Sequence, residues 1–109
     1  MLNCGHTIGH ALEKLSDYAL SHGEAVAIGC VEESSLAAEM GLAPAAWPAE
    51  VAEAFRLANL PTRRPEGLRV SDHALWEVIA RDKKRVGADI LFALPCGWGD
   101  VRLVPVPCP

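Results

Sequence analysis

The chain has 109 residues and a net charge of −4, half of its residues are apolar, and 22% are charged. This composition predicts one small globular domain with a modest core, and it excludes a disordered tail and argues against a general nucleic-acid-binding protein. No apolar run reaches the roughly 18 residues of a membrane span, and the N-terminus shows no signal-peptide pattern. We therefore expect a cytoplasmic protein with neither nucleic-acid nor membrane partners.

The first expected helix covers residues 5–17, with Asn3 as its N-cap. At about 100° per residue, ligand-type side chains share one face of this helix and apolar side chains share the other. The polar face holds His6, His10, Glu13 and Asp17, and the apolar face holds Ile8, Leu12 and Leu15. His6 and His10 are four residues apart, a spacing that places two rings one above the other, as in many metal sites.

A second helix is expected to begin at Ser21, because Ser21 and Glu24 match a capping box. This pattern places His22 in the first helical turn. The positive end of the helix dipole disfavours the imidazolium there and favours the neutral imidazole that binds metals. If the first two helices form an antiparallel pair, His22 returns towards the start of the first one.

The second helix is apolar on all sides over residues 25–31, which predicts burial all round. Residues 32–35 bring a polar side back, and Gly41 is expected to end the helix. In the first helix, Gly5 and Gly9 are poor helix formers. Their presence indicates that another backbone or a ligand comes close to them.

Two further helices are expected. The third starts at Pro48, a favourable first-turn residue, and ends before Leu60. The fourth is capped by Ser71 and runs to about Arg81. Residues 61–69 join them as an ordinary loop.

The tail is expected to form a β-hairpin, because its hydrophobic period changes from that of a helix to that of a strand. Residues 90–94 and 101–104 are short β-type runs around a glycine-rich turn, and Pro105 and Pro107 are expected to end regular structure. The predicted fold class is therefore mainly α, as a single domain over residues 1–109 with a short C-terminal β-hairpin.

The histidines make a metal site the leading interpretation, but His6 and His22 alone do not complete one. A catalytic zinc ion normally takes three protein ligands and keeps one open position. Glu13 and Glu24 are the candidates for a third ligand within the chain, although Glu24 is also needed for its cap.

Other polar groups each allow two interpretations from their pattern. Asn3 is either a helix cap or a polar substrate contact. The cluster Lys83, Lys84 and Arg85 is either a solvated charge run at a helix end or a contact for a phosphate or carboxylate. The four cysteines show no Cys-x-x-Cys pairing, and we expect reduced, buried thiols.

Two long motifs resemble those of the 3-dehydroquinate synthase family of sugar-phosphate cyclases. Residues 2–13, LNCGHTIGHALE, are similar to the family's Leu-Asn-Phe-Gly-His-Thr-x-Gly-His-Ala-x-Glu. Residues 21–29 resemble its His-Gly-Glu-Ala-Val-Ala-Ile-Gly segment. Residues 60–61, 82–84 and 90–95 then follow in the family's order, so the resemblance covers nearly the whole chain.

The resemblance implies a function. Members of the family convert 3-deoxy-D-arabino-heptulosonate 7-phosphate to 3-dehydroquinate and phosphate in the shikimate pathway, with NAD and a divalent zinc or cobalt ion. They carry an N-terminal α/β NAD-binding domain before a largely helical metal- and substrate-binding domain, and we expect the full-length enzyme to be a homodimer. This chain is similar to the C-terminal domain only, so we expect it to be part of a longer chain and inactive alone.

The resemblance also implies roles for single residues. His6 and His22 look like the two histidine metal ligands, and His10 looks like the catalytic histidine that contacts the phosphate and assists proton movement. The other implied substrate contacts are polar: Asn3, Lys83 and Lys84, with one of the two lysines on the phosphate. The family's third ligand, a glutamate of the N-terminal domain, has no counterpart in this chain.

Three alternatives stay open. Sibling cyclases of the 2-deoxy-scyllo-inosose or 2-epi-5-epi-valiolone synthase type share the histidine motifs. Metal-dependent polyol dehydrogenases also use histidines on such helices, although the Asn-x-Gly-His-Thr-x-Gly-His signature argues against them. The chain could also be a non-catalytic metal-binding or interaction remnant. It departs from the family at Cys4, where an aromatic is usual, and at Cys30, where methionine is common.

Overall fold

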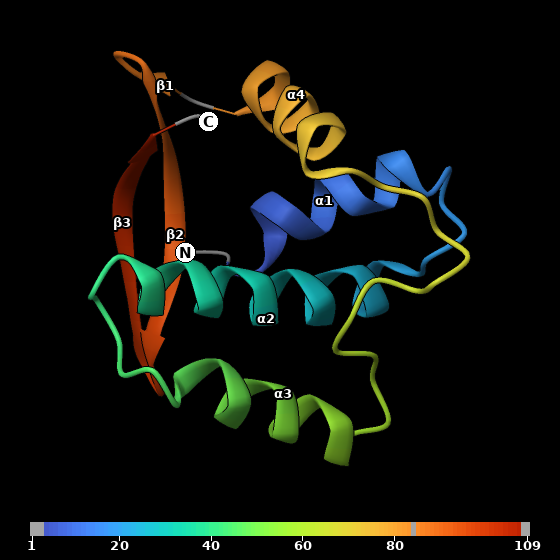
Figure 1. Ribbon diagram of the computed structural model, residues 1–109, viewed down its shortest axis with the longest axis horizontal. Helices are drawn as coiled ribbons and strands as arrows, with labels where there is room; N and C mark the ends of the chain where they lie inside the picture. The colour runs from blue at the N-terminus through green and yellow to red at the C-terminus, as the bar shows by residue number, and fades with distance from the viewer. Residues whose placement is uncertain (1–3, 84, 108–109) are drawn as a thin grey trace.

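The computed structural model describes residues 4–83 and 85–107, so Asn3, Lys84 and Cys108 lie outside the described residues. In the described part, four helices lie to one side of a three-stranded antiparallel sheet (Figure 1). The elements are α1 (His6–Leu15), α2 (His22–Glu39), α3 (Trp47–Leu57), α4 (Asp72–Asp82), β1 (Arg85–Val86), β2 (Asp89–Gly97) and β3 (Asp100–Pro107). The expected helices and hairpin are all present, and β1 is an addition.

Helix α2 is the centre of the fold, since it packs against α1, α3 and strand β2 (Figure 1). Residues 25–31 are buried or half-buried, as their all-round apolar pattern predicts. The expected polar side at residues 32–35 is wrong for Glu33 and Ser34, which are both fully buried. Each finds a polar partner inside: Glu33 accepts from backbone N–H groups of α1, and the Ser34 hydroxyl donates to a carbonyl one turn earlier.

Helix α1 is shorter than expected at both ends. Its N-cap residue is Gly5, with φ 80°, and not Asn3. It ends at Leu15, because Asp17 and Tyr18 have φ values of 53° and 61°, so Asp17 leaves the helix and its polar face. The predicted apolar face is confirmed by buried Ile8 and Leu12 and half-buried Leu15.

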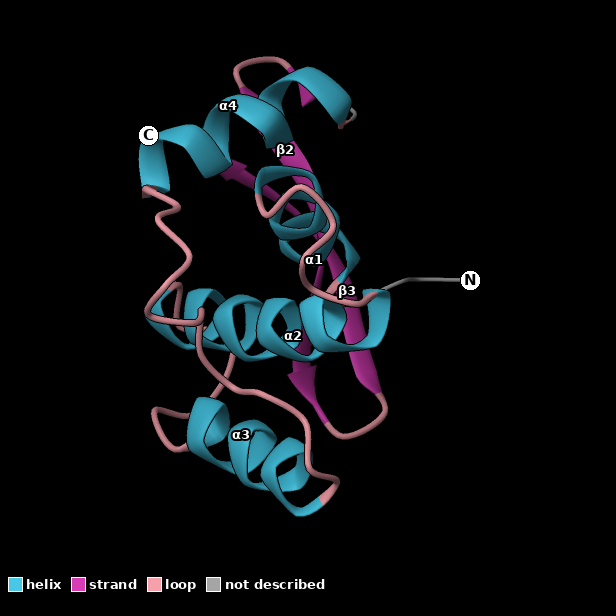
Figure 2. Ribbon diagram, turned by 90° about the vertical axis from the view of Figure 1, so that its right-hand side faces the viewer, coloured by secondary structure: helices cyan, strands magenta, loops and turns pink. Residues whose placement is uncertain are grey.

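The backbones of α1 and α2 meet at glycines, where Figure 2 shows α1 against α2. A Cβ on Gly29 would lie 2.6 Å from the Gly9 nitrogen and would also collide with the Gly5 carbonyl oxygen. A Cβ on Gly9 would lie 2.9 Å from the Ala25 carbonyl oxygen. The predicted close approach at Gly5 and Gly9 is therefore confirmed, and the approaching group is the backbone of α2.

The sheet closes the core with strand β2. Its side chains Ile90, Phe92 and Leu94 are fully buried. The expectation that Pro105 and Pro107 end regular structure is wrong, since both pair with β2 in the strand β3. Strand β3 is an edge strand, and prolines are tolerated at an edge because one side of the strand needs no donor.

Helices α3 and α4 complete the domain much as the sequence predicts. Pro48 lies in the first turn of α3, and the Ser71 hydroxyl caps α4 by accepting from the Ala74 backbone at 3.1 Å. An ion pair of Lys14 with Asp82 joins α1 to the end of α4. Within residues 4–83 and 85–107, no helix is both long and apolar enough to cross a bilayer.

The glycine contact makes a prediction for Gly29→Ala. The added methyl group meets backbone atoms that cannot rotate away, so we expect a loss of about 2 kcal/mol in the free energy of unfolding. Gly23→Ala is the matched control on the same helix, because nothing lies within 4 Å of its Cβ. It should leave stability unchanged or raise it by up to about 1 kcal/mol. Urea unfolding of both variants checks this, and equal effects of the two substitutions would contradict it.

Candidate metal and substrate site

Two histidines from different helices face each other at the N-terminal ends of α1 and α2. His6 is the first residue of α1 and His22 the first residue of α2. Their ring centroids lie 5.3 Å apart, with the ring planes tilted by 58°. The return of His22 to the start of the first helix, predicted for a helix pair, is confirmed.

Each ring uses its Nδ1 atom within the protein. Nδ1 of His6 lies 3.2 Å from the Cys4 carbonyl oxygen, and Nδ1 of His22 lies 2.7 Å from Oε1 of Glu13. Oxygen atoms of this kind accept only, so both Nδ1 atoms donate a proton. In the neutral imidazoles the lone pair is then on Nε2. Metal-binding histidines are oriented in this same way, by an oxygen on the other ring nitrogen.

The two imidazoles fit a shared divalent cation. With metal–nitrogen distances of about 2.0–2.1 Å, two rings on a tetrahedral ion have centroids roughly 5 Å apart, close to the 5.3 Å observed. Neither expected third ligand joins them. Glu13 is bound to the Nδ1 side of His22, and Glu24 accepts from the Ser21 backbone at 2.9 Å in the capping box. Residues 4–83 and 85–107 contain no group of three or more ligand-type side chains placed to hold a metal ion.

The capping box sets the position of His22. The Ser21 hydroxyl accepts from the Glu24 backbone at 3.1 Å, while the Glu24 carboxylate accepts from the Ser21 backbone. These hydrogen bonds to Ser21 hold the pKa of Glu24 below its usual value. The start of α2 is thus fixed on both sides of His22, as the sequence predicts.

A buried carboxylate of α2 binds the backbone on both sides of His6. Glu33 of α2 accepts from the backbone N–H of Gly5 at 2.8 Å and from that of Ile8 at 3.1 Å. Burial raises the pKa of Glu33 to about 7, although these N–H groups and the positive charge of Lys83 act in the opposite direction. The first turn of α1 is therefore bound to α2 through one side chain.

Two of the predicted substrate-side residues, His10 and Lys83, lie in the described part of the chain. His10 is exposed, one turn after His6. Lys83 is the C-cap residue of α4, and its charge acts on the pKa of Glu33. The pKa of Asp82 is lowered chiefly by its hydrogen bond with Lys14, and His10 also contributes. His10 thus lies in the middle of α1, and Lys83 directly follows Asp82, which pairs with Lys14 in the last turn of α1. Asn3 and Lys84 lie outside the described residues.

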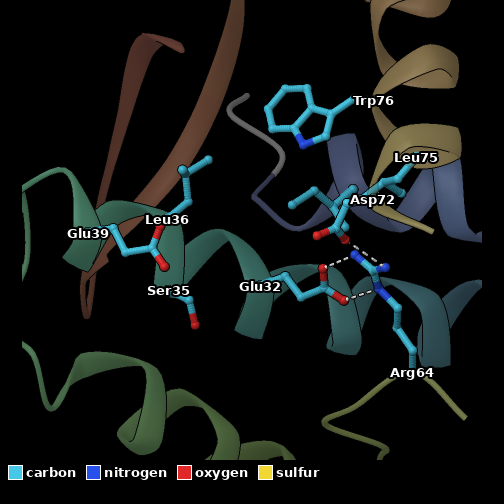
Figure 3. A pocket seen from close by; sticks show the side chains of 9 residues that line it. Glu32, Ser35, Leu36, Glu39, Arg64, Asp72, Leu75 and Trp76 are labelled. Carbon is cyan, nitrogen blue, oxygen red and sulfur yellow. Dashed lines mark hydrogen bonds and ion pairs between the residues drawn. The ribbon is translucent and has the colours of Figure 1, made fainter. Parts of the chain in front are cut away.

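A separate pocket of about 240 Å³ lies between α2, the loop before α4, and α4 itself (Figure 3). Arg64 crosses it and is held by both oxygens of Glu32, at 2.6 and 2.8 Å, and by Asp72 at 3.1 Å. Each of these charges has an opposite partner, and none of the four described histidines lines the pocket. It is a structural ion-pair cluster apart from the histidine pair.

Comparison with known proteins decides the family. A family profile described as 3-dehydroquinate synthase C-terminal matches residues 1–85. The chain belongs to this family. The match includes both histidines of the pair, the Glu33 carboxylate and Lys83.

Curated relatives of the 3-dehydroquinate synthase family are similar over nearly the whole chain. A 3-dehydroquinate synthase of Synechococcus sp. is 41% identical over 108 residues, covering 94% of this chain and 28% of the relative. One of Lactiplantibacillus plantarum is 39% identical, and one of Aeropyrum pernix is 40% identical; each is covered over 29% of its length. The chain therefore spans less than a third of the relatives that it matches.

Two solved structures have the same fold over 96% of this chain. One is a 2-deoxy-scyllo-inosose synthase, with a TM-score of 0.70 and 25% identity. The other is a 2-deoxy-scyllo-inosose synthase complexed with carbaglucose-6-phosphate, NAD+ and Co2+, with a TM-score of 0.72 and 26% identity. The chain covers 30% and 31% of these two structures. Both are sugar-phosphate cyclases, so the fold agrees with the family.

The roles of two carboxylates, Glu13 and Glu33, differ from those that the sequence predicts. Glu13 is expected as a possible ligand, whereas it binds the Nδ1 side of His22. Glu33 is expected in a solvent-facing stretch. One signal was available: Glu33 follows Gly29 by four residues, which places a charged group on the helix face that carries the closest backbone contact.

The buried Glu33 predicts a pH dependence of stability. A carboxyl pKa that rises from 4.5 to about 7 on folding means that the native state binds more protons between these values. The stabilising contribution is therefore full below pH 4.5 and is lost as pH rises through 7, by about 1.4 kcal/mol per unit inside this window. Urea unfolding at pH 5, 6 and 7 measures it. Glu33→Gln should remove this slope. The prediction would be contradicted if the variant and the wild type showed the same difference in the free energy of unfolding between pH 5 and pH 7.

Proposed function

We propose that this chain is the metal- and phosphate-binding part of a 3-dehydroquinate synthase, which converts 3-deoxy-D-arabino-heptulosonate 7-phosphate to 3-dehydroquinate and phosphate. The observation that carries the proposal is the facing pair His6 and His22. Both Nδ1 atoms are hydrogen-bonded within the protein, which leaves the lone pair of each Nε2 atom for a metal ion. The family match and relatives of about 40% identity support this substrate.

In this proposal the chain holds a divalent zinc or cobalt ion through Nε2 of His6 and of His22. The ion would act as a Lewis acid on the substrate hydroxyls. A carboxylate from an upstream domain completes the ligand set, and the same domain binds NAD. The NAD+ and Co2+ in the related 2-deoxy-scyllo-inosose synthase complex support both cofactors.

In this proposal the remaining roles belong to His10 and Lys83. His10 is exposed and one turn from His6, which supports a role in contacting the substrate phosphate and in moving a proton during its elimination. Lys83 supplies a positive charge for that phosphate. Asn3 and Lys84 stay predictions from the family motif, since they lie outside the described residues.

A second candidate function is that of a 2-deoxy-scyllo-inosose synthase, and the two structural matches favour it on fold. Their identities are 25% and 26%, against 39–41% for the 3-dehydroquinate synthases. The higher identity supports the heptulosonate phosphate as substrate.

The ligand assignment predicts metal affinity. His6→Ala and His22→Ala should each weaken cobalt binding by about tenfold or more, because one of two nitrogen donors is lost. His73→Ala is the matched control, since His73 is exposed on α4 and pairs with Glu77. Isothermal titration of each variant with cobalt chloride measures the affinities. Affinities equal to the wild type in both ligand variants would refute the assignment.

The proposed division between two domains predicts activity. The purified chain should show no turnover with NAD, cobalt and the heptulosonate phosphate, because cofactor residues and one ligand are expected upstream.

When the chain is joined to the NAD-binding domain of a 3-dehydroquinate synthase relative, it should form 3-dehydroquinate. In this fusion, His10→Gln should lower kcat by about a hundredfold or more. Chromatography of the product decides between substrates. Turnover by the chain alone, or inosose as the favoured product, would contradict the proposal.

A further inference from the structure

We propose that Glu33 is a positioning residue for the metal site: its carboxylate holds the first turn of α1 against α2, and thereby holds His6 opposite His22. The inference rests on the proposed function, since it gives the reason why one of the two proposed ligands is correctly placed. The hydrogen bonds that the structure shows for Glu33 are with backbone N–H groups and not with either histidine ring.

The contact brackets His6 on both sides. Oε1 of Glu33 accepts from the N-cap residue Gly5 at 2.8 Å, and Oε2 accepts from the third helical residue, Ile8, at 3.1 Å. Both donors are first-turn N–H groups that have no partner within a helix. Because Glu33 is fully buried, water cannot replace the carboxylate without opening the interface between the helices.

The N-cap residue of α1 cannot provide these contacts itself. The N-cap residue is a glycine with φ 80°, and it makes no side-chain cap. A Cβ at Gly5 would collide with Sγ of Cys30 and would lie 2.8 Å from the Val26 carbonyl oxygen. The close helix contact therefore excludes a capping side chain at Gly5, and the acceptors that the structure shows come from Glu33 of α2.

The start of α2 has an ordinary local cap, with which the Glu33 contacts at α1 can be compared. There, two local side chains cap the helix together, since the Ser21 hydroxyl binds the N3 backbone and the Glu24 carboxylate binds the N-cap backbone. At α1, the two oxygens of Glu33 serve the same two positions. The N–H groups at the positive end of the α1 dipole favour hydrogen-bond acceptors at this place.

The link from Glu33 to His6 is short. The acceptor for Nδ1 of His6 is the carbonyl of Cys4, the residue directly before Gly5. If the Gly5 N–H loses Glu33, the backbone of His6 and the acceptor that orients its ring are both released. His22 has its own supports in the capping box and Glu13, so the effect should be specific to the His6 side.

The test uses the chain as it stands, with cobalt chloride as the probe and with NMR to follow the imidazole and backbone signals. Glu33→Gln keeps the size of the side chain but places an NH2 group against one N–H donor. It should weaken cobalt binding by about tenfold to a hundredfold, as loss of a supporting contact does at other metal sites. The amide signals of Gly5 and Ile8 should shift, and their amide protons should exchange faster with solvent. The signals of Glu13 and of the His22 ring should stay unchanged.

Ser34→Ala is the control for a general loss of stability. Ser34 is as buried as Glu33 and lies beside it, but its hydroxyl donates to the Cys30 carbonyl within α2 and not to α1. It should leave the cobalt affinity within about twofold of the wild type. If Glu33→Gln does not fold, Glu33→Asp replaces it, with the charge kept and the reach shortened, and it should weaken binding by a smaller factor.

The outcomes separate the two claims. If His6→Ala weakens cobalt binding and Glu33→Gln does not, the positioning role is overturned while the proposed function stands. If Glu33→Gln and Ser34→Ala weaken binding equally, Glu33 acts only through stability and the inference is again overturned. If His6→Ala leaves binding unchanged, the ligand assignment fails, and the positioning role falls with it.

Discussion

The backbone contact between α1 and α2 is the constraint on which the rest of the structure depends. Gly5 and Gly9 of α1 face Gly29 of α2 so closely that a Cβ on Gly29 would overlap backbone atoms. Two helices that touch through their backbones can bring their first residues together, and the histidine rings at those positions lie 5.3 Å apart. The glycines cost helix propensity, and the close packing of the surrounding apolar side chains offsets that cost.

The same contact explains why the polar supports of the site come from distant residues. A helix start pressed against its neighbour has no room for an ordinary capping side chain, so Glu33 of α2 supplies the acceptors from 28 residues away. Glu13 supports the other ring, across nine residues. Each ring donates a hydrogen bond from Nδ1, and the lone pair of its Nε2 atom is left for a metal ion. Each ring is therefore held in a defined orientation by an oxygen atom of this chain.

Much of this could be predicted from local pattern. The capping box at Ser21 and the return of His22 to His6 depend on spacing within a few residues, and both are confirmed. The polar face of α1 loses Asp17, which lies beyond the end of the helix. The buried role of Glu33 could not be read in this way, because it depends on which face of α2 meets α1. The prolines of β3 were misjudged for a similar reason: their tolerance follows from the position of β3 at the sheet edge, which only the assembled sheet defines.

The central claim is that the glycine contact and its two supporting carboxylates orient His6 and His22 for one shared divalent ion. A crystal structure of the cobalt-loaded chain, with anomalous diffraction measured at the cobalt absorption edge, tests it most directly. We predict a single anomalous peak bonded to Nε2 of both rings, with Glu13 still on Nδ1 of His22 and Glu33 still on the first turn of α1. A cobalt ion on Nδ1 of either ring, on only one of the two histidines, or at a place away from both would contradict it.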